Sequence, residues 1–219
     1  AVDTAIACHE LGIKTVAVTA GYISPKPRVE FFKHIDAANV DLKSFDDDFY
    51  HKLTGAHLKP VLDTLVYLKE KTGIWFELTT LLIPGENDSD QELDKMTRWV
   101  VANLGPDVPM HFTAFHPDWK MRDHPPTPPA TLSRARTVAM ENGIRYAYTG
   151  NVHDGIGGST WCHSCNQLLI ERDWYELGVW HLTEDGCCDQ CGEPCAGLFE
   201  ARPGQWGGKR QPVRMREIA

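Results

Sequence analysis

Apolar and polar residues alternate along this chain in blocks that predict strands and helices in turn. Short β-branched or apolar runs, typical of strands in a parallel sheet, lie at 14–19, 38–43, 74–83, 108–115 and 145–148. Runs with apolar residues three and four positions apart, typical of helices, lie at 4–11, 25–34, 58–71, 89–104 and 131–142. Strands that alternate with helices at this spacing pair in parallel through right-handed crossovers. The pattern therefore predicts an α/β fold of the βα-barrel kind.

Individual residues mark several helix ends. Gly12, Gly73 and Gly143 directly follow the apolar periodicity, and glycine in that place commonly ends a helix. Ser89 and Glu92 have the spacing of a capping box, in which each side chain accepts a hydrogen bond from the backbone of the other residue. We expect the β-branched strand at 14–19 to be buried, and the proline-rich stretch at 117–129 to be irregular.

The segment Ala38-Asn39-Val40-Asp41-Leu42-Lys43 carries the first chemical signal. Alternation along a strand places Asp41 and Lys43 on one face and Leu42 on the other. The carboxyl ends of parallel strands form the rim where βα-barrels place their chemistry. The segment therefore predicts a functional site at this rim, and a salt bridge that merely closes the strand is the alternative.

Polar residues recur along or just after the other predicted strands. They are Thr19, Tyr22, Glu77, Thr79, Thr80, His111 and His116. Each is a weak signal alone, since a strand histidine is more often a hydrogen-bonded core residue than a ligand. Their recurrence at one rim predicts a polar pocket for a hydrogen-bonding ligand.

The cysteines are clustered near the end of the chain, where six of the seven lie between 162 and 195. Cys162-His-Ser-Cys165 and Cys188-Asp-Gln-Cys191 are two Cys-x-x-Cys motifs, which we call the cysteine knuckles. Two such turns supply four thiolates to one tetrahedral ion, and the segment 167–183 between them has the length of a hairpin. We predict a zinc-ribbon-like module with structural zinc. An iron–sulfur cluster and unliganded thiols are the alternatives.

Three further cysteines complicate this interpretation. Cys187 and Cys195 leave the ligand register ambiguous, although Cys188 gives the two-residue gap to Cys191 and is the better ligand. Cys8 lies in a predicted helix, where we expect a small buried apolar residue.

Composition and glycine placement indicate the organisation of the chain. Glycines at 155, 157 and 158 predict a flexible join, which divides a partial barrel (1–150) from the cysteine module (151–200) and a basic, glycine-rich tail (201–219). The formal net charge of -8 argues against a nucleic acid or an anionic membrane as the main partner. No apolar run is long enough to span a bilayer, and the acidic start is no export signal, so we expect the cytoplasm. We also expect the chain to begin partway into a larger protein.

The order of several motifs resembles a known family. TVAVTAGYIS, AANVDLKSFDDDFYHKLTG, ELTTLLIPGENDSDQEL, VPMHFTAFHPDWKM and YTGN, followed by the two knuckles, are similar to the AmmeMemoRadiSam-system radical SAM enzymes. These are relatives of the pyruvate formate-lyase activating enzyme. The resemblance implies the C-terminal part of a partial (β/α)6 TIM-like barrel. It also implies binding of S-adenosylmethionine and a [4Fe–4S] cluster, formation of a 5′-deoxyadenosyl radical, and hydrogen abstraction from an unknown substrate, with a protein partner as one possibility.

The resemblance also implies which residues bind the cofactor. Thr19 and Gly21 match a strand end beside it, with Ala20 in place of the family's asparagine. Asp41 and Lys43 match the DLK motif near its ribose and carboxylate. The remaining matches are Pro84 and Gly85, with Ile83, in an apolar turn near the adenine, and His111 near the ribose.

Two departures from the family shape the functional expectation. The Cys-x-x-x-Cys-x-x-Cys motif that holds the cluster and the Gly-Gly-Glu strand are both absent from these 219 residues. We therefore expect the parent protein to be the enzyme, with this portion alone inactive and the 14–19 strand left as an unpaired edge. Two alternatives remain, namely a zinc-knuckle interaction module on an inactive barrel and a Schiff-base lyase that uses Lys43.

Overall fold

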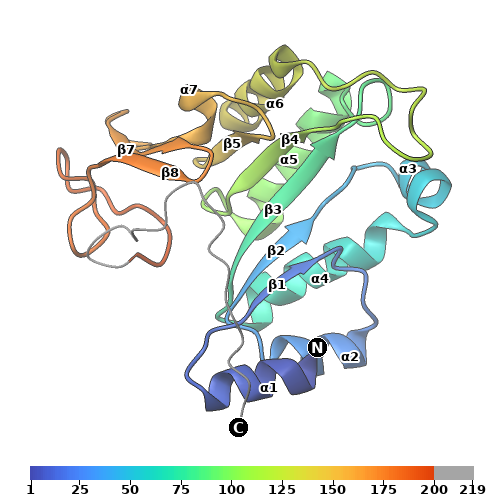
Figure 1. Ribbon diagram of the computed structural model, residues 1–219, viewed down its shortest axis with the longest axis horizontal. Coiled ribbons are helices and arrows are strands. Elements are labelled where there is room, and N and C mark those ends of the chain that lie inside the picture. Colours follow the sequence, from blue (N-terminus) through green and yellow to red (C-terminus); the bar gives the residue numbers. More distant parts are fainter. Residues whose placement is uncertain (200–219) are drawn as a thin grey trace, which may run out of the picture. The chain divides into compact units, whose positions relative to one another are not determined.

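The computed structural model describes residues 1–199, so the predicted tail at 201–219 lies outside the described residues. The chain forms two compact units, of which the first ends at Gly157 and the second begins at Gly158 (Figure 1). In the part of the chain that the structure describes, no helix has the length and apolar character needed to cross a membrane.

The first unit is built on a five-stranded parallel sheet with the strands in chain order. The strands are β1 (Val16–Thr19), β2 (Ala37–Asp41), β3 (Trp75–Leu82), β4 (Met110–Ala114) and β5 (Ala147–Gly150). The helices are α1 (Val2–Glu10), α2 (Pro25–Phe32), α3 (Asp47–Phe49), the π-helical turn η1 (Tyr50–Thr54), α4 (Leu58–Lys71), α5 (Asp90–Leu104), α6 (Pro129–Glu141) and α7 (Gly155–Gly158). The predicted α/β fold with a parallel sheet is confirmed.

Helices cover one face of this sheet and form the core with it. Val40, Leu78 and Phe112 point from the central strands into this face and are fully buried. Their partners on α4, α5 and α6 include Leu65, Leu93 and Leu132, which are also fully buried. Figure 1 shows α4 and α5 behind the strands. Burial of these apolar side chains against the helices therefore leaves the residues at alternate strand positions on the opposite face of the sheet.

The outer strand β1 is the main departure from the predicted core. Val16 and Val18 are 64% and 79% exposed, so the prediction of a buried strand is wrong. In the sheet order, β1 pairs with β2 and forms one edge, so the prediction that this strand is an edge strand is confirmed. Among the described residues, the helices of the core lie on one face of the sheet, and no helix covers the β-branched residues on the other face of this edge strand.

The segment after β5 is also more ordered than predicted. Residues 155–158 were expected to be a flexible join, but they form the short helix α7. Asp154 caps it, since its Oδ1 accepts a hydrogen bond from the backbone N–H of Gly157 at 2.9 Å and Oδ2 accepts one from Thr149. The prediction failed because a side-chain cap outweighs the low helix propensity of three glycines.

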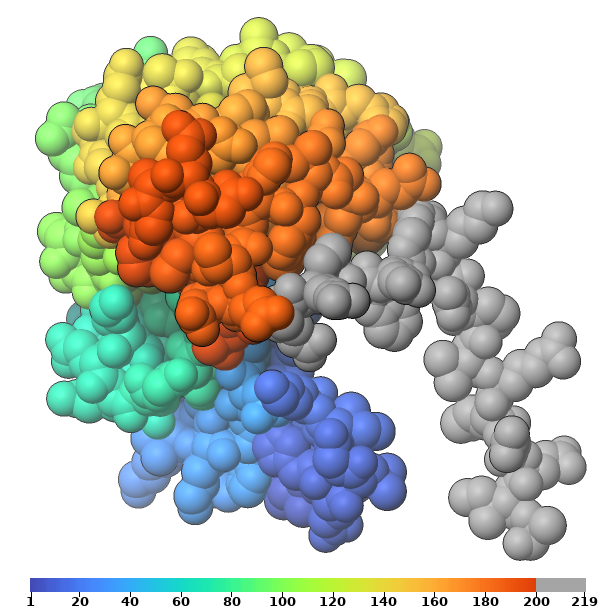
Figure 2. All heavy atoms as spheres, turned by 90° about the vertical axis from the view of Figure 1, so that its left-hand side faces the viewer, coloured from blue at the N-terminus to red at the C-terminus, as the bar shows by residue number. Residues whose placement is uncertain are grey.

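The second unit is a small antiparallel sheet with the order β6-β7-β8. Its strands are β6 (Thr160–Trp161), β7 (Leu168–Asp173) and β8 (Glu176–Trp180). Strands β7 and β8 form the hairpin predicted between the two knuckles, and Figure 2 shows this part of the chain, orange to red, as one contiguous group of atoms.

Candidate functional site

A row of polar residues crosses the face of the sheet opposite α4, α5 and α6, which we call the open face. The strand register places Asp41 beside Thr79, Thr79 beside His111, and His111 beside Tyr148. Register partners in a parallel sheet point to the same side, so these side chains share one face. All four residues are partly exposed. The structure thus brings Asp41 and His111 together across neighbouring strands.

The side chains on the open face contact one another directly. Nε2 of His111 lies 2.6 Å from Oε2 of Glu77, and the ring of His111 stacks on that of Tyr148 with centroids 5.0 Å apart. The hydroxyl of Thr79 donates to Oδ1 of Asn39 at 2.9 Å. These contacts hold donors and acceptors in fixed positions beside Asp41, which is the arrangement that a hydrogen-bonding ligand requires.

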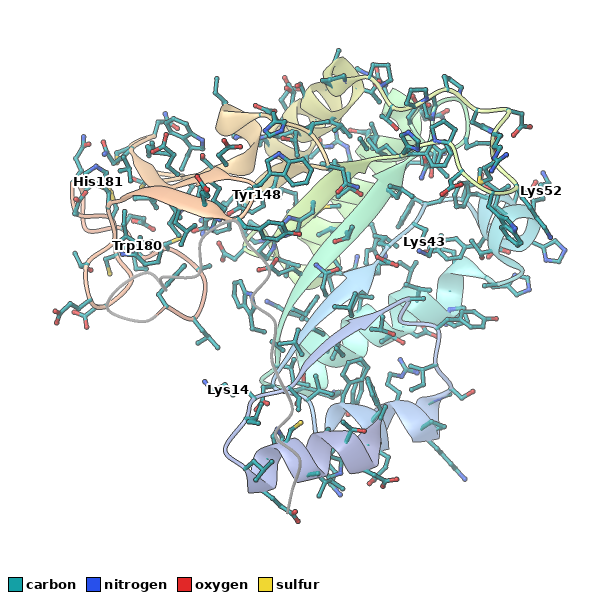
Figure 3. The ribbon with its side chains drawn as sticks, in the orientation of Figure 1. Lys14, Lys43, Lys52, Tyr148, Trp180 and His181 are labelled. Carbon is teal, nitrogen blue, oxygen red and sulfur yellow. The ribbon has the colours of Figure 1, made fainter. Side chains whose placement is uncertain are left out.

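Lys43 lies just past the end of β2, and Figure 3 labels it there together with Tyr148 on β5. Its Nζ lies 2.8 Å from Oδ2 of Asp41, and the two side chains are 37% and 32% exposed. Leu42 between them is fully buried on the helix side. The predicted alternation across this segment is therefore confirmed, although Lys43 itself lies outside the strand.

The other predicted site residues lie at the same end of the sheet but not all on the open face. Thr19 has Val40 as its register partner and so lies on the helix side, where its Oγ1 accepts a hydrogen bond from the backbone N–H of Gly21 at 3.2 Å. Gly21 is buried, and a Cβ there would lie 2.8 Å from Cγ1 of Val40. Pro84 and Gly85 form the turn after β3, closed by a hydrogen bond from the N–H of Gly85 to Asp88.

Thr80 and Glu92 depart from the predictions. Thr80 is buried among the helices and donates to the carbonyl of Leu42 at 2.8 Å, because its neighbour Thr79 already occupies the open face. Ser89 caps α5 as predicted, but the carboxylate of Glu92 does not complete the capping box. It accepts instead from the hydroxyl of Ser44 at 2.5 Å and from the N–H of Phe45 at 2.8 Å.

Two polar residues of the open face were not predicted from the sequence. Asn39 and Tyr148 were not among the predicted residues, yet the register aligns them with Glu77 and His111. The signal was present for Asn39, since it lies two positions before Asp41 and alternation puts both on one side. Tyr148 could not be assigned a face until the start of β5 was known. His116 and Tyr22 are exposed and belong to the loops beyond the strands.

The four cysteines of the two knuckles meet in the second unit. The Sγ atoms of Cys162, Cys165, Cys188 and Cys191 all lie within 4.8 Å of one another. Cys162 and Cys191 are 3.6 Å apart, and Cys165 and Cys188 are 3.7 Å apart. Cys188, not its neighbour Cys187, belongs to this group.

The surroundings of the thiols shift their pKa values in different directions. Burial opposes ionisation of Cys188, but the backbone N–H groups of Cys191 and Gln190 outweigh it and lower the pKa of Cys188 to about 7. The N–H of Gln167 acts in the same direction on Cys165, but burial and the neighbouring thiols outweigh it and raise the pKa of Cys165 to about 12. Four thiolates this close repel one another, and a bound cation would relieve that repulsion.

Two acid–histidine pairs support the knuckles, and the remaining cysteines stand apart from them. His163 contacts Glu193 at 3.1 Å, and His181 contacts Asp189 at 2.7 Å, so each pair ties a residue beside or within the second knuckle to an earlier part of the unit. Cys195 is buried in the second unit outside the group of four. Cys8, expected to be buried, is only partly so.

Comparison with known proteins identifies relatives of this chain. The chain matches no protein-family model. It is 42% identical over 192 residues to an uncharacterized protein of Methanocaldococcus jannaschii, covering 87% of this chain and 56% of that protein. It is 23% identical over 162 residues to the 4-hydroxyphenylacetate decarboxylase activating enzyme of Clostridioides difficile (68% of this chain, 50% of that enzyme). It is 30% identical over 103 residues to the pyruvate formate-lyase-activating enzyme of Clostridium pasteurianum (47% and 42%). The chain therefore spans about half the length of these curated relatives.

Solved structures share the fold of the first unit. A domain of a pyruvate-formate lyase-activating enzyme from Bacteroides vulgatus superposes with a TM-score of 0.59 at 15% identity, covering 68% of this chain and 89% of that one. SuiB of Streptococcus suis, bound to S-adenosylmethionine, gives 0.54 at 15% identity (69% and 36%). A radical SAM methyltransferase from Sphaerobacter thermophilus gives 0.51 at 15% identity (64% and 41%). The chain is therefore similar in sequence to activating enzymes and has the fold found in radical SAM enzymes.

Proposed function

We propose that this chain is the cofactor-binding and C-terminal portion of a radical SAM enzyme of the activating-enzyme kind. When bound and reduced through an iron–sulfur cluster, S-adenosylmethionine supplies a 5′-deoxyadenosyl radical that abstracts hydrogen from a substrate. The observation that carries the proposal is the polar row on the open face, in which Asp41 and His111 share one side of the sheet. We further propose membership of the AmmeMemoRadiSam-system group and, as substrate, a protein partner, by analogy with the activating enzymes among the relatives.

The donors and acceptors of the first unit fit the chemical groups of the cofactor. The carboxylate of Asp41 accepts hydrogen bonds, as ribose hydroxyls require, and the ammonium of Lys43 is an ion-pair partner for the methionine carboxylate. His111 offers a ring nitrogen on the same face. The other proposed contacts are the strand end at Thr19 and Gly21 and the turn at Pro84 and Gly85, which lies beside the buried Ile83 and can pack against an adenine.

The iron–sulfur cluster does not fit the residues of this chain. These 219 residues contain no Cys-x-x-x-Cys-x-x-Cys, and the group of four cysteines lies in the second unit. We propose that the cluster ligands are supplied by sequence outside these residues, since the relatives are about twice as long. The role of this chain is then to bind and orient the cofactor.

We also propose that the four cysteines hold one structural zinc ion. With Zn–S bonds of about 2.3 Å, a regular tetrahedron separates its sulfurs by about 3.8 Å. The Sγ–Sγ distances of 3.6 Å between Cys162 and Cys191 and 3.7 Å between Cys165 and Cys188 support this geometry. A cluster of several irons holds its thiolates on different metal atoms and needs them further apart. The close approach of all four sulfurs therefore favours a single ion.

Anaerobic reconstitution of the full-length protein tests the radical proposal. We expect a sulfur-to-iron absorption band, binding of S-adenosylmethionine, and release of 5′-deoxyadenosine under reductant. D41N should weaken cofactor binding by about tenfold, a loss that corresponds to about 1.4 kcal/mol. D107N, which alters an exposed carboxylate paired with Arg145, is the matched control and should bind normally. A full-length protein with an intact cluster that neither binds nor cleaves the cofactor would overturn the proposal.

Metal analysis of the 219-residue chain tests the zinc proposal. We expect about one zinc per chain and neither iron nor labile sulfide. Stoichiometric iron with visible colour would show that the four cysteines hold an iron–sulfur cluster and not zinc. A second unit that is folded without any metal would show that the cysteines hold no metal ion.

The contact between Lys43 and Asp41 weighs against the Schiff-base alternative. A lyase lysine must have its amine available to attack a carbonyl group, whereas Nζ of Lys43 is engaged by the carboxylate of Asp41 at 2.8 Å. Borohydride trapping of a carbonyl compound on Lys43 would nevertheless revive that alternative.

A further inference from the structure

The backbone of Lys43 is held by hydrogen bonds to side chains and not by strand pairing in the sheet. The parallel ladder between β2 and β3 ends at the pair Asp41 and Thr79, so the two following residues have no strand partner. The backbone carbonyl of Leu42 and both the N–H and the carbonyl of Lys43 nevertheless form hydrogen bonds with side chains. We propose that Asn87 and Tyr50 are positioning residues that fix the main chain of Lys43 and thereby set its ammonium group against Asp41. The part of this inference that concerns the cofactor rests on the proposed function.

Asn87 contacts Lys43 from the turn after β3. It is fully buried, and its Nδ2 donates to the carbonyl of Lys43 at 2.6 Å and to the carbonyl of Leu81 at 2.9 Å. Its Oδ1 accepts from the N–H of Ile83 at 2.7 Å. One amide group therefore joins Lys43, two residues past β2, to the end of β3 and the start of the turn.

Only a primary amide fits this position. Two carbonyl oxygens face Nδ2 and need donors, while one N–H faces Oδ1 and needs an acceptor. An aspartate has nearly the same shape but places an oxygen against the two carbonyls, and a buried carbonyl that loses its donor is destabilised. Asparagine is therefore required here for its donors and acceptor together, and not for its size.

Tyr50 contacts Lys43 from the other side. Its phenolic oxygen accepts from the N–H of Lys43 at 3.0 Å, and the residue is only 3% exposed. Burial raises the pKa of Tyr50 to about 12, so the phenol is uncharged at neutral pH. The carbonyl of Leu42 accepts in addition from Thr80. The peptide groups on both sides of Lys43 are thus bonded to the nearby Tyr50 and to two residues, Thr80 and Asn87, that are distant in sequence.

This arrangement limits the freedom of the Lys43 side chain. A lysine loses considerable side-chain entropy when it is held in one geometry, and an exposed ion pair alone repays little of it. With the main chain fixed in this way, Nζ lies 2.8 Å from Oδ2 of Asp41. Pre-organised groups bind a ligand more tightly because less order has to be created on binding.

Chemical labelling tests the positioning without any cofactor. The full-length protein is acylated briefly with acetic anhydride, and the fraction of modified Lys43 is measured by peptide mass spectrometry relative to Lys33. We expect N87D and Y50F each to raise the labelling of Lys43 by about threefold, since the ion pair with Asp41 loosens. N103D alters an exposed asparagine on α5, and Y67F removes a hydroxyl on α4, so both controls should leave the labelling unchanged. Unchanged labelling in both N87D and Y50F would overturn the inference.

A double-mutant cycle separates positioning from stability. In the reconstituted protein, N87D and Y50F should each weaken binding of S-adenosylmethionine by about tenfold. In the K43A background the same changes should alter affinity by less than about twofold, because their effect acts through the Lys43 side chain. Equal losses in both backgrounds would mean a merely structural role and would overturn the inference. Y50F keeps the buried ring in place, so it remains informative should N87D fold poorly.

The two measurements also separate this inference from the proposed function. If the wild-type protein does not bind S-adenosylmethionine, the proposed function fails, and so does the inference that Asn87 and Tyr50 contribute to cofactor binding. The labelling result still decides whether Asn87 and Tyr50 position Lys43.

Discussion

Oε2 of Glu77 lies 2.6 Å from Nε2 of His111, and both residues are about one third exposed on the open face of the sheet. The pair lies beside Asp41, because Thr79 is the register partner of both Asp41 and His111. A carboxylate that holds an imidazole ring from the neighbouring strand fixes the direction in which its other nitrogen points. The ring is further limited by stacking on Tyr148.

The first prediction concerns this pair. E77A should free the His111 ring and weaken binding of S-adenosylmethionine in the reconstituted full-length protein by about threefold to tenfold. E70A removes an exposed glutamate near the end of α4 and is the control. Calorimetric titration of both variants measures the effect. An affinity for E77A equal to that of E70A would show that Glu77 does not orient a cofactor ligand.

The second prediction distinguishes two adjacent cysteines. C188S removes one of the four clustered sulfurs and should cost the chain its zinc, whereas C187S should retain about one zinc per chain. Because a structural zinc ion contributes folding energy directly, the segment from β6 to β8 should become sensitive to protease in C188S. Metal analysis and limited proteolysis provide the two readouts. Loss of zinc in C187S with retention in C188S would reverse the ligand register.

The features that followed from local patterns were predictable from sequence. Alternation placed Asp41 opposite Leu42, and knuckle spacing selected the four cysteines that meet in the structure. The apolar periodicity gave α4 with its observed ends, 58–71. In each case the sequence pattern and the structural feature that it predicts involve residues of the same short segment or motif.

The features that failed depend on tertiary contacts. Glu92 bonds to Ser44, which is 48 positions away, in place of the capping box that its local spacing predicted. Val18 is exposed because, within residues 1–199, no helix covers its face of the edge strand, although its residue type is typical of buried strands. The contact of Asn87 with Lys43 also joins distant segments and has no local signature beyond the turn residues around it.

The third prediction concerns pH. Hydrogen bonds that His124 donates to the carboxylate of Glu86, and then to that of Asp123, raise the pKa of His124, which joins the turn after β3 to the loop at 117–128. A raised pKa in the folded state means that the contact stabilises the fold fully below the unfolded value of about 6.5 and is lost as the pH rises through the folded value. H124Q should therefore lower the melting temperature at about pH 6 and have little effect at about pH 9.

The comparison of the two pH values serves as the internal control for His124. E86Q should show the same pH dependence, because it removes the carboxylate charge that favours the imidazolium. A destabilisation by H124Q that is equally large at both pH values would mean that packing against Phe115, and not charge, is what His124 contributes.

The last prediction compares two glycines with nearly the same backbone conformation. Gly12 and Gly21 have φ values of +70° and +66°, in the left-handed region that favours glycine. A Cβ at position 12 meets nothing within 4 Å, whereas one at position 21 lies 2.8 Å from Cγ1 of Val40. G12A should therefore lower the free energy of unfolding by about 1–2 kcal/mol, the cost of the backbone conformation alone. G21A should cost about 2–4 kcal/mol, because Val40 must also move in a close-packed core. Urea denaturation measures both, and equal costs would mean that the strand end at Gly21 is free to shift away from the helices.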